Sequence, residues 1–295
     1  MTQSINTHAE ANLTGSIWMV AAMAAFAVED AFIKAASVTV PVGQILIIFG
    51  LGGACLFACL ARIRNDPLFV AEAVSGTMRV RAVFEVIGRL FYVLAISLTP
   101  LSAATVILQA TPLVVVAGAA VVFGEKVGWR RWMAVVVGLT GVMVIVQPGT
   151  DSFSLLSVLA VIGMIGFAGR DLASRAAPAS LNTAALGFYG FLSVVVAGVL
   201  FSAWQAVPFV TPGRMASLFL VASVVSGVAA YACLMRAMRT GEVSSVTPFR
   251  YTRLLFGIAI GVAVFGERLE FSMLLGSGLI VLSGLFILWR GRQVP

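Results

Sequence analysis

The segment Phe26-Ala27-x-x-Asp30-x-x-x-Lys34-Ala35-Ala36 returns 141 residues later as Phe167-Ala168-x-x-Asp171-x-x-x-Arg175-Ala176-Ala177. A second segment, Phe123-Gly124-Glu125-Lys126, returns 142 residues later as Phe265-Gly266-Glu267-Arg268. Because the two offsets are nearly equal, the chain consists of two repeats. If each repeat holds an odd number of membrane spans, the second copy inserts upside-down relative to the first, as in many secondary transporters.

The composition places the chain in a membrane. Hydrophobic residues make up 60% of the chain and charged residues only 11%, with a mean hydropathy of +1.05, whereas a soluble domain has roughly 25% charged residues. Stretches of about 20 apolar residues, long enough to cross a membrane, occur ten times: 13–36, 41–61, 80–98, 101–123, 129–147, 152–169, 182–204, 213–237, 243–264 and 271–289. We therefore predict an all-α integral membrane protein with ten transmembrane helices as two inverted five-helix repeats, residues 1–147 and 148–295.

Basic residues are distributed unevenly between the two ends of the predicted spans. One side has thirteen and the other has three, namely Lys34, Arg214 and Arg268. The positive-inside rule predicts that both termini are cytoplasmic in a bacterial inner membrane. The net charge of +7 is then a matter of topology and of contact with anionic membrane lipid. No basic surface interleaved with aromatic residues lies outside the predicted spans, so no nucleic-acid partner is expected.

Ionisable residues deep inside the predicted spans are the first candidates for function, because charges in a membrane are costly. They are Glu29, Glu85, Arg89, Arg250 and Arg253. Glu85 and Arg89 lie one helical turn apart on one face of the third span, and Tyr92 continues the same stripe. The excess of central arginines favours a substrate with an anionic group. In the alternative interpretation, Glu85 and Arg89 neutralise each other and only lock helices together, or some arginines extend to the cytoplasmic headgroups.

Two polar stripes occupy equivalent positions in the repeats. The fourth span carries Ser102, Thr105 and Gln109 on one face, and the ninth carries Ser244, Thr247 and Tyr251. They predict the lining of a shared pore, or alternatively hydrogen bonds between packed helices. Pro112 and Pro248 each remove an intrahelical hydrogen bond and predict bends, but they do not match under the repeat offset, so no symmetric hinge is expected.

The charged repeat motifs have two interpretations. Asp30 with Lys34, and Asp171 with Arg175, are spaced as i,i+4 pairs that end the first and sixth spans. Such groups cap helix ends and fix their depth in the membrane. Alternatively, they form opposing gate contacts, made on one side of the membrane while broken on the other.

The sequence offers no set of residues for catalysis or metal binding. The three cysteines, Cys55, Cys59 and Cys233, fall within predicted spans, and the single histidine is His8 near the N-terminus. A metal site needs more ligands than these, and no nucleophile with a base is evident. We therefore expect no enzyme activity and no cofactor, while the oligomeric state stays open.

The repeat motifs, together with Pro41-Val42-Gly43-Gln44-Ile45 and Pro100-Leu101-Ser102-Ala103-Ala104, resemble the EamA-type drug/metabolite transporter superfamily over essentially the whole chain. Many members have an arginine after the second-span Gln-Ile, where this chain has Phe49. The resemblance implies cytoplasmic termini and a central cavity between spans 3, 4, 8 and 9, to which span 8 contributes Tyr231. Within the superfamily, the chain is similar to the YddG-type exporters of aromatic amino acids.

The leading hypothesis is an exporter of small metabolites that works by alternating access, with aromatic or large neutral amino acids as the favoured substrates. Arg89 or Arg250 would bind the carboxylate, and Glu85 or Glu29 the ammonium group. The side chain would contact three tyrosines, Tyr92, Tyr231 and Tyr251. The alternatives are an exporter of drugs or cationic metabolites, for which the carboxylates would be essential, and a carrier of the S-adenosylmethionine type.

Overall fold

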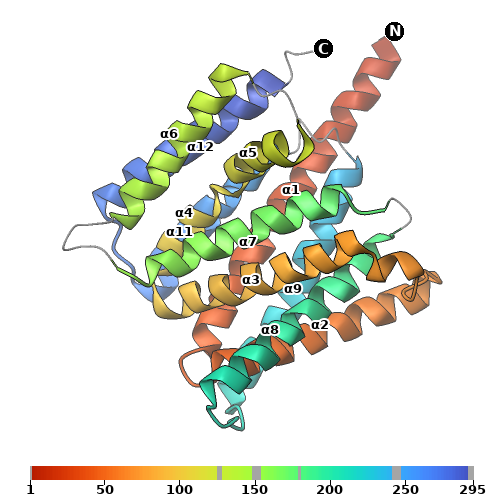
Figure 1. Ribbon diagram of the computed structural model, residues 1–295, viewed down its shortest axis with the longest axis vertical. Coiled ribbons are helices and arrows are strands. Elements are labelled where there is room, and N and C mark those ends of the chain that lie inside the picture. Colours follow the sequence, from red (N-terminus) through yellow and green to blue (C-terminus); the bar gives the residue numbers. More distant parts are fainter. Residues whose placement is uncertain (1, 125–127, 148–153, 179–180, 241–246, 292–295) are drawn as a thin grey trace.

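The computed structural model describes the whole chain except residues 1, 125–127, 148–153, 179–180, 241–246 and 292–295 (Figure 1). Every regular element in the described residues is helical. In chain order the elements are α1 (Thr2–Ala36), α2 (Val42–Arg64), η1 (Ala71–Val74), α3 (Gly76–Leu98), α4 (Leu101–Leu108), α5 (Thr111–Phe123), α6 (Trp129–Val146), α7 (Ser157–Arg175), α8 (Thr183–Gln205), α9 (Arg214–Thr240), η2 (Thr247–Tyr251), α11 (Thr252–Phe265) and α12 (Phe271–Gly291).

The helices correspond to the ten predicted spans. Among the described residues, six segments are long and apolar enough to cross a membrane: 10–36, 42–64, 101–123, 157–174, 183–205 and 214–237. The helices α6 and α12 contain shorter apolar stretches, and the ninth span consists of η2 followed by α11. The third span, α3, is less apolar because it carries Arg79, Arg81, Glu85 and Arg89.

Equivalent helices of the two repeats pack against each other in opposite directions, which shows that the repeats are inverted. In the pair α2 and α8, Gly43 lies against Gly198, whereas Phe57, near the other end of α2, lies against Gly187. In the pair α6 and α12, Gly138 contacts Ser283, and Gly141, one turn later, contacts Gly276. These pairs form opposite edges of the molecule in Figure 1.

The remaining helices lie between these edges and pack in contacts that the repeat exchanges. The contact of α1 with α9 has its counterpart in that of α7 with α3, and the contact of α11 with α1 has its counterpart in that of α5 with α7. The start of α1 and the end of α12 lie at the same end of the view in Figure 1.

The fourth span is broken in its middle. Helix α4 ends at Leu108 and α5 begins at Thr111. Pro112, in the first turn of α5, cannot donate to the Leu108 carbonyl. The Thr111 hydroxyl donates to that carbonyl instead, at 2.5 Å.

The ninth span changes from a 3-10 helix to an α-helix at the equivalent position, where η2 ends at Tyr251 and α11 begins at Thr252. Under the 142-residue offset, Tyr251 matches Gln109, which follows α4 directly. The breaks are therefore symmetric, although Pro112 and Pro248 are not. The prolines do not match under the repeat offset, as the sequence indicates, but the backbone breaks at equivalent positions in both spans.

Helices α3 and α7 approach each other through glycine. A Cβ atom at Gly166 would lie 2.4 Å from the backbone nitrogen of Gly88, and one at Gly163 would lie 2.9 Å from that of Tyr92. Such backbone proximity excludes larger residues at the contact. It also brings the charged side chains of α3 and α7 within reach of each other.

Candidate functional site

Ionisable side chains from α1, α3, α7, η2 and α11 form two clusters of ion pairs within the helices. The described members comprise five arginines and four carboxylates: Arg81, Arg89, Arg170, Arg250, Arg253, Glu29, Asp30, Glu85 and Asp171. The arginines are thus in excess, as the sequence predicts, but more residues take part than the sequence indicates.

The first group, here called the α1 cluster, consists of Glu29, Asp30, Arg89, Tyr92 and Arg253. Arg89 Nη1 donates to Glu29 Oε1 at 2.7 Å. Asp30 Oδ2 accepts from Arg253 Nη2 at 2.6 Å and from the Tyr92 hydroxyl at 2.9 Å. Both carboxylates are at most 1% exposed, and the side chains of Arg89 and Arg253 are 13% and 15% exposed, so the α1 cluster is largely buried.

Aromatic rings cover the guanidinium groups of the α1 cluster. Arg89 lies 4.7 Å from the centre of the Phe49 ring. Arg253 lies 5.0 Å from that of Phe26 and 5.6 Å from that of Tyr92. Phe49 therefore takes part in the site by stacking on an arginine, since cations on desolvated aromatic faces are stabilised electrostatically.

Several polar atoms of the α1 cluster are buried without a hydrogen-bond partner in the described part of the chain. Two are acceptors, Glu29 Oε2 and Asp30 Oδ1, and two are donors, Arg89 Nε and Arg253 Nε. Buried polar groups are nearly always hydrogen-bonded, so such atoms require an explanation. A ligand with both a positive and a negative group would satisfy both kinds.

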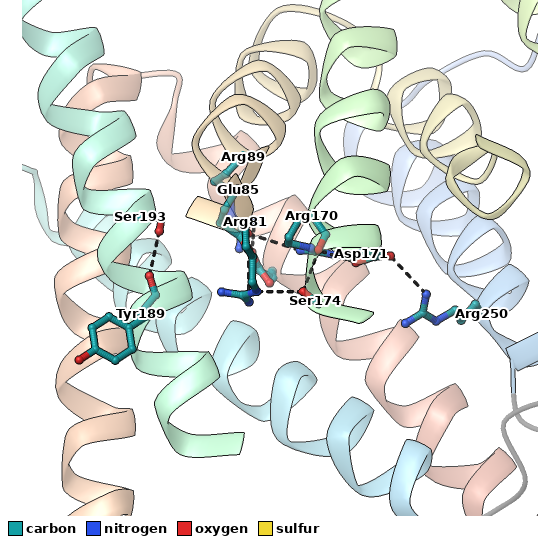
Figure 2. A network of polar contacts seen from close by, with 10 residues as sticks. Arg81, Glu85, Arg89, Arg170, Asp171, Ser174, Tyr189, Ser193 and Arg250 are labelled. Carbon is teal, nitrogen blue, oxygen red and sulfur yellow. Dashed lines mark hydrogen bonds and ion pairs between the residues drawn. The ribbon is translucent and has the colours of Figure 1, made fainter. Parts of the chain in front are cut away.

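The second group, here called the α7 cluster, consists of Arg81, Glu85, Arg170, Asp171, Ser174 and Arg250 (Figure 2). Arg170 donates from Nε and Nη2 to Asp171 Oδ1 at 3.0 and 2.8 Å, and its Nη1 lies 3.4 Å from Glu85 Oε1. Arg81 donates to the Ser174 hydroxyl at 2.9 Å and pairs with Glu85 at 3.7 Å. The α7 cluster thus joins α3 to α7.

Arg250 approaches the α7 cluster from η2, and Figure 2 shows it apart from the other side chains, with one contact to Asp171. Its Nη1 lies 3.7 Å from Asp171 Oδ2, beyond hydrogen-bond distance, and its Nε has no partner among the described residues. The side chains of Arg170, Asp171 and Arg250 are 26–30% exposed. This end of the network is therefore reachable from outside the bundle.

A third group of charges, here called the latch, lies where α1 and α11 end. Lys34 Nζ donates to the carbonyls of Ile96 and Thr99, at the end of α3, at 3.0 and 2.6 Å. Glu267 accepts from the backbone nitrogens of Leu101 and Ser102, at the start of α4, at 2.6 and 3.0 Å, and from the Ser102 hydroxyl at 2.6 Å. The helix dipole favours both placements, and the two side chains lie 3.9 Å apart.

Two pairings that the i,i+4 spacing suggests do not form. Arg89 pairs with Glu29 of another helix, and Glu85 pairs with Arg81 and Arg170, so Glu85 and Arg89 do not neutralise each other. Asp30 is held by Arg253 and Tyr92, whereas Lys34 lies beside Glu267 in the latch. Helical spacing identifies neighbours within one helix, but the contacts between packed helices decide the partners here.

The other predicted residues take varied positions. Thr105 is buried against Gly257, Gln109 is buried beside the break in the fourth span, and the hydroxyl of Tyr251 abuts Gly284 of α12. Tyr231 packs edge-on against Phe57 at 5.3 Å. Ser244 lies outside the described residues, as do the side chains of Thr247, Pro248 and Arg175.

Sequence reasoning missed two arginines of the network, which were assigned to the cytoplasmic flank. Arg81 precedes Glu85 by one helical turn, a spacing that could have revealed it. Arg170 occupies in the second repeat the position of Glu29 in the first, and this equivalence was the available signal. Both lie within the network because α3 packs closely on α7, with Arg81 buried and Arg170 partly exposed.

Comparisons with known proteins agree with this architecture. The model of the EamA-like transporter family matches residues 13–147 and 155–289. The chain is 26% identical to a riboflavin transporter of Vibrio cholerae over 95% of both chains, and 28% identical to the pseudopaline exporter CntI of Pseudomonas aeruginosa over 92% of this chain and 94% of the exporter. It is also 26% identical to an S-adenosylmethionine uptake transporter of Rickettsia bellii over 70% of both chains.

A solved crystal structure shares the fold, with a TM-score of 0.62 at 18% identity over 97% of this chain and 99% of the other.

Proposed function

This chain belongs to the EamA-like transporter family, and from that premise we propose that it exports amino acids, with aromatic or large neutral ones preferred. That it transports small metabolites and is not an enzyme follows from the family and from relatives named as transporters. The choice of amino acids among small metabolites is the step that the site supports.

The unpartnered atoms of the α1 cluster carry this proposal. An amino acid offers an ammonium group, which would donate to Glu29 Oε2 and Asp30 Oδ1, and a carboxylate, which would accept from Arg89 Nε and Arg253 Nε. Charge-assisted hydrogen bonds of this kind are about twice as strong as neutral ones. The rings of Phe26, Phe49 and Tyr92 beside these groups favour an aromatic or large apolar side chain.

We infer that the substrate crosses the membrane by alternating access, in which one end of the network is open while the other is closed. The latch closes the end where α1 and α11 finish, while the α7 cluster is partly exposed at the other end of the network. With both termini in the cytoplasm of a bacterial cell, the exposed α7 cluster faces the cytoplasm and the latch faces outward. The described conformation is then one that receives substrate from inside the cell.

Counterflow in proteoliposomes tests the proposal. We expect purified protein to accumulate radiolabelled L-phenylalanine in vesicles preloaded with unlabelled amino acid, and Arg89→Gln to abolish this. Arg214→Gln, the same chemical change at an exposed residue, serves as the matched control. Protein that moves riboflavin or S-adenosylmethionine but no amino acid would refute the proposed substrate class.

A cationic metabolite is the second candidate, favoured by the two carboxylate oxygens that are buried without partners. For such a substrate, Glu29→Gln would abolish transport, whereas Arg250→Gln would leave it intact. The amino-acid hypothesis expects both variants to lose activity toward L-phenylalanine.

A further inference from the structure

We propose that Arg250 is the residue that captures the carboxylate of the incoming substrate, and that it does so by exchanging Asp171 for the substrate as its counter-ion. The inference rests on the proposed function and selects one arginine among the five that the network offers. It also implies that Asp171 competes with the substrate carboxylate for Arg250.

In the part of the chain that the structure describes, Arg250 has the least occupied guanidinium of the network. Each of the other arginines makes at least one side-chain contact of 3.4 Å or shorter with an oxygen. The only described ion pair of Arg250 is 3.7 Å long, and its Nε is buried without a partner. An arginine with free donors can bind a carboxylate through two parallel hydrogen bonds.

The balance of charge favours an anion at the same end. In the described residues, the α7 cluster contains three arginines and two carboxylates, whereas the α1 cluster contains two of each. The surplus positive charge therefore lies in the α7 cluster, where the side chains of Arg170, Asp171 and Arg250 are 26–30% exposed. An anionic group from that side reaches this cluster before it reaches the more deeply buried α1 cluster.

Exchange at Arg250 leaves no isolated charge. When the substrate carboxylate replaces Asp171, Asp171 still accepts two hydrogen bonds from Arg170. An ion pair that loses one partner inside a protein costs several kcal/mol, so a swap that keeps both groups paired avoids that cost.

The exchange also acts on one link within the second repeat and leaves a link between the repeats in place. Arg250 and Arg253 both belong to the ninth span, and they contact the two equivalent aspartates, Asp171 in α7 and Asp30 in α1. The 2.6 Å contact of Arg253 with Asp30 holds the ninth span to α1, while the longer contact of Arg250 is released. Substrate binding thus frees the ninth span from α7 alone, which is a direct way to couple capture to movement.

The test compares transport of L-phenylalanine with transport of an analogue that lacks the carboxylate. L-Phenylalaninamide keeps the ammonium group and the ring of L-phenylalanine but lacks the negative charge. In proteoliposomes, we expect Arg250→Gln to lower the flux of L-phenylalanine relative to the amide by at least about tenfold, the lower end for one close ion pair, with the flux of the amide unchanged. Asp171→Asn should lower the KM for L-phenylalanine severalfold and leave that for the amide as it was.

An Arg250→Gln variant that keeps the wild-type preference, or that loses both fluxes equally, would overturn the role of Arg250. Arg214→Gln controls for the change of charge alone. Wild-type protein that moves neither compound would instead refute the proposed function, so the two failures are distinguishable.

Discussion

Asp30 and Asp171 hold equivalent places in the two repeats, yet their surroundings differ. Asp30 is 1% exposed and is held by Arg253 and Tyr92 from two other helices. Asp171 is 26% exposed, with its closest described contact from its own neighbour Arg170. The preceding residue reverses its charge, from Glu29 in the first repeat to Arg170 in the second.

The comparison shows how an inverted repeat becomes directional. Duplication places an aspartate at the same point of both halves, and the substitutions around it make one half sealed and the other reachable. Both aspartates are contacted by the ninth span, whereas the equivalents of Arg250 and Arg253 in the fourth span are Leu108 and Thr111. The basic residues of the ninth span therefore contribute to this difference between the repeats.

The largest expected effect is the difference in stability between two variants, each with one of the aspartates neutralised. Asp30→Asn leaves Arg253 buried without its counter-ion and should lower the free energy of unfolding by about 3–5 kcal/mol. Asp171→Asn acts on a partly exposed pair and should lower it by less than about 1 kcal/mol. Denaturant titration in detergent micelles measures both, and equal losses would show that the two halves are not different in this respect.

Much of the fold follows from the sequence, because apolar length and repeat offset are local properties. The ten spans and their inversion could be predicted from residues such as the Phe-Gly-Glu motifs at Glu125 and Glu267. The matching breaks at Gln109 and Tyr251 could not, because Pro112 and Pro248 suggest different positions. The backbone therefore breaks at the same point of both repeats although the residues at the break differ.

For the ion-pair network, the sequence indicates several of the members but not how they pair. Glu85, Arg89, Tyr92 and Arg250 were recognised because charge and polarity inside a span are conspicuous. Their partners depend on which helices touch, and the close approach of α3 to α7 at Gly88 is a tertiary feature. Without knowledge of this helix contact, the position of Arg81 and Arg170 near the ends of their spans indicates a contact with lipid headgroups.

A second prediction compares the two ends of the network by testing whether the latch closes the end where it lies. Glu267→Gln weakens three hydrogen bonds to the start of α4, and bonds to a charged group contribute about 1.5–3 kcal/mol. We expect a reporter cysteine at Ala104, introduced after Cys55, Cys59 and Cys233 are replaced by alanine, to react about tenfold faster with a water-soluble maleimide, since 1.4 kcal/mol corresponds to a factor of ten.

Glu270→Gln is the matched control, since Glu270 is exposed three residues away. An unchanged labelling rate in Glu267→Gln would mean that the latch does not close this end.

The close contact of α3 with α7 differs from its counterpart between α1 and α9. Gly88 and Gly166 meet in the first, whereas the residue equivalent to Gly88 in α9 is Ala230. Gly166→Ala would place a Cβ 2.4 Å from the backbone of α3, and overpacking of this kind costs about 1–3 kcal/mol. Gly278→Ala, where the space is open, should change stability little, and thermal unfolding in detergent distinguishes the two.

The smallest effect concerns the break that both spans share. Thr111 is the equivalent of Arg253, and its hydroxyl satisfies the Leu108 carbonyl where Arg253 instead binds Asp30. Thr111→Val keeps the shape but leaves that buried carbonyl without its donor, which should cost about 1 kcal/mol. Thr140 makes a similar bond at an exposed position, so Thr140→Val should be nearly neutral under the same denaturant titration. Equal losses in the two variants would show that the hydroxyl of Thr111 does not stabilise the break, and that the fourth span bends for reasons of packing alone.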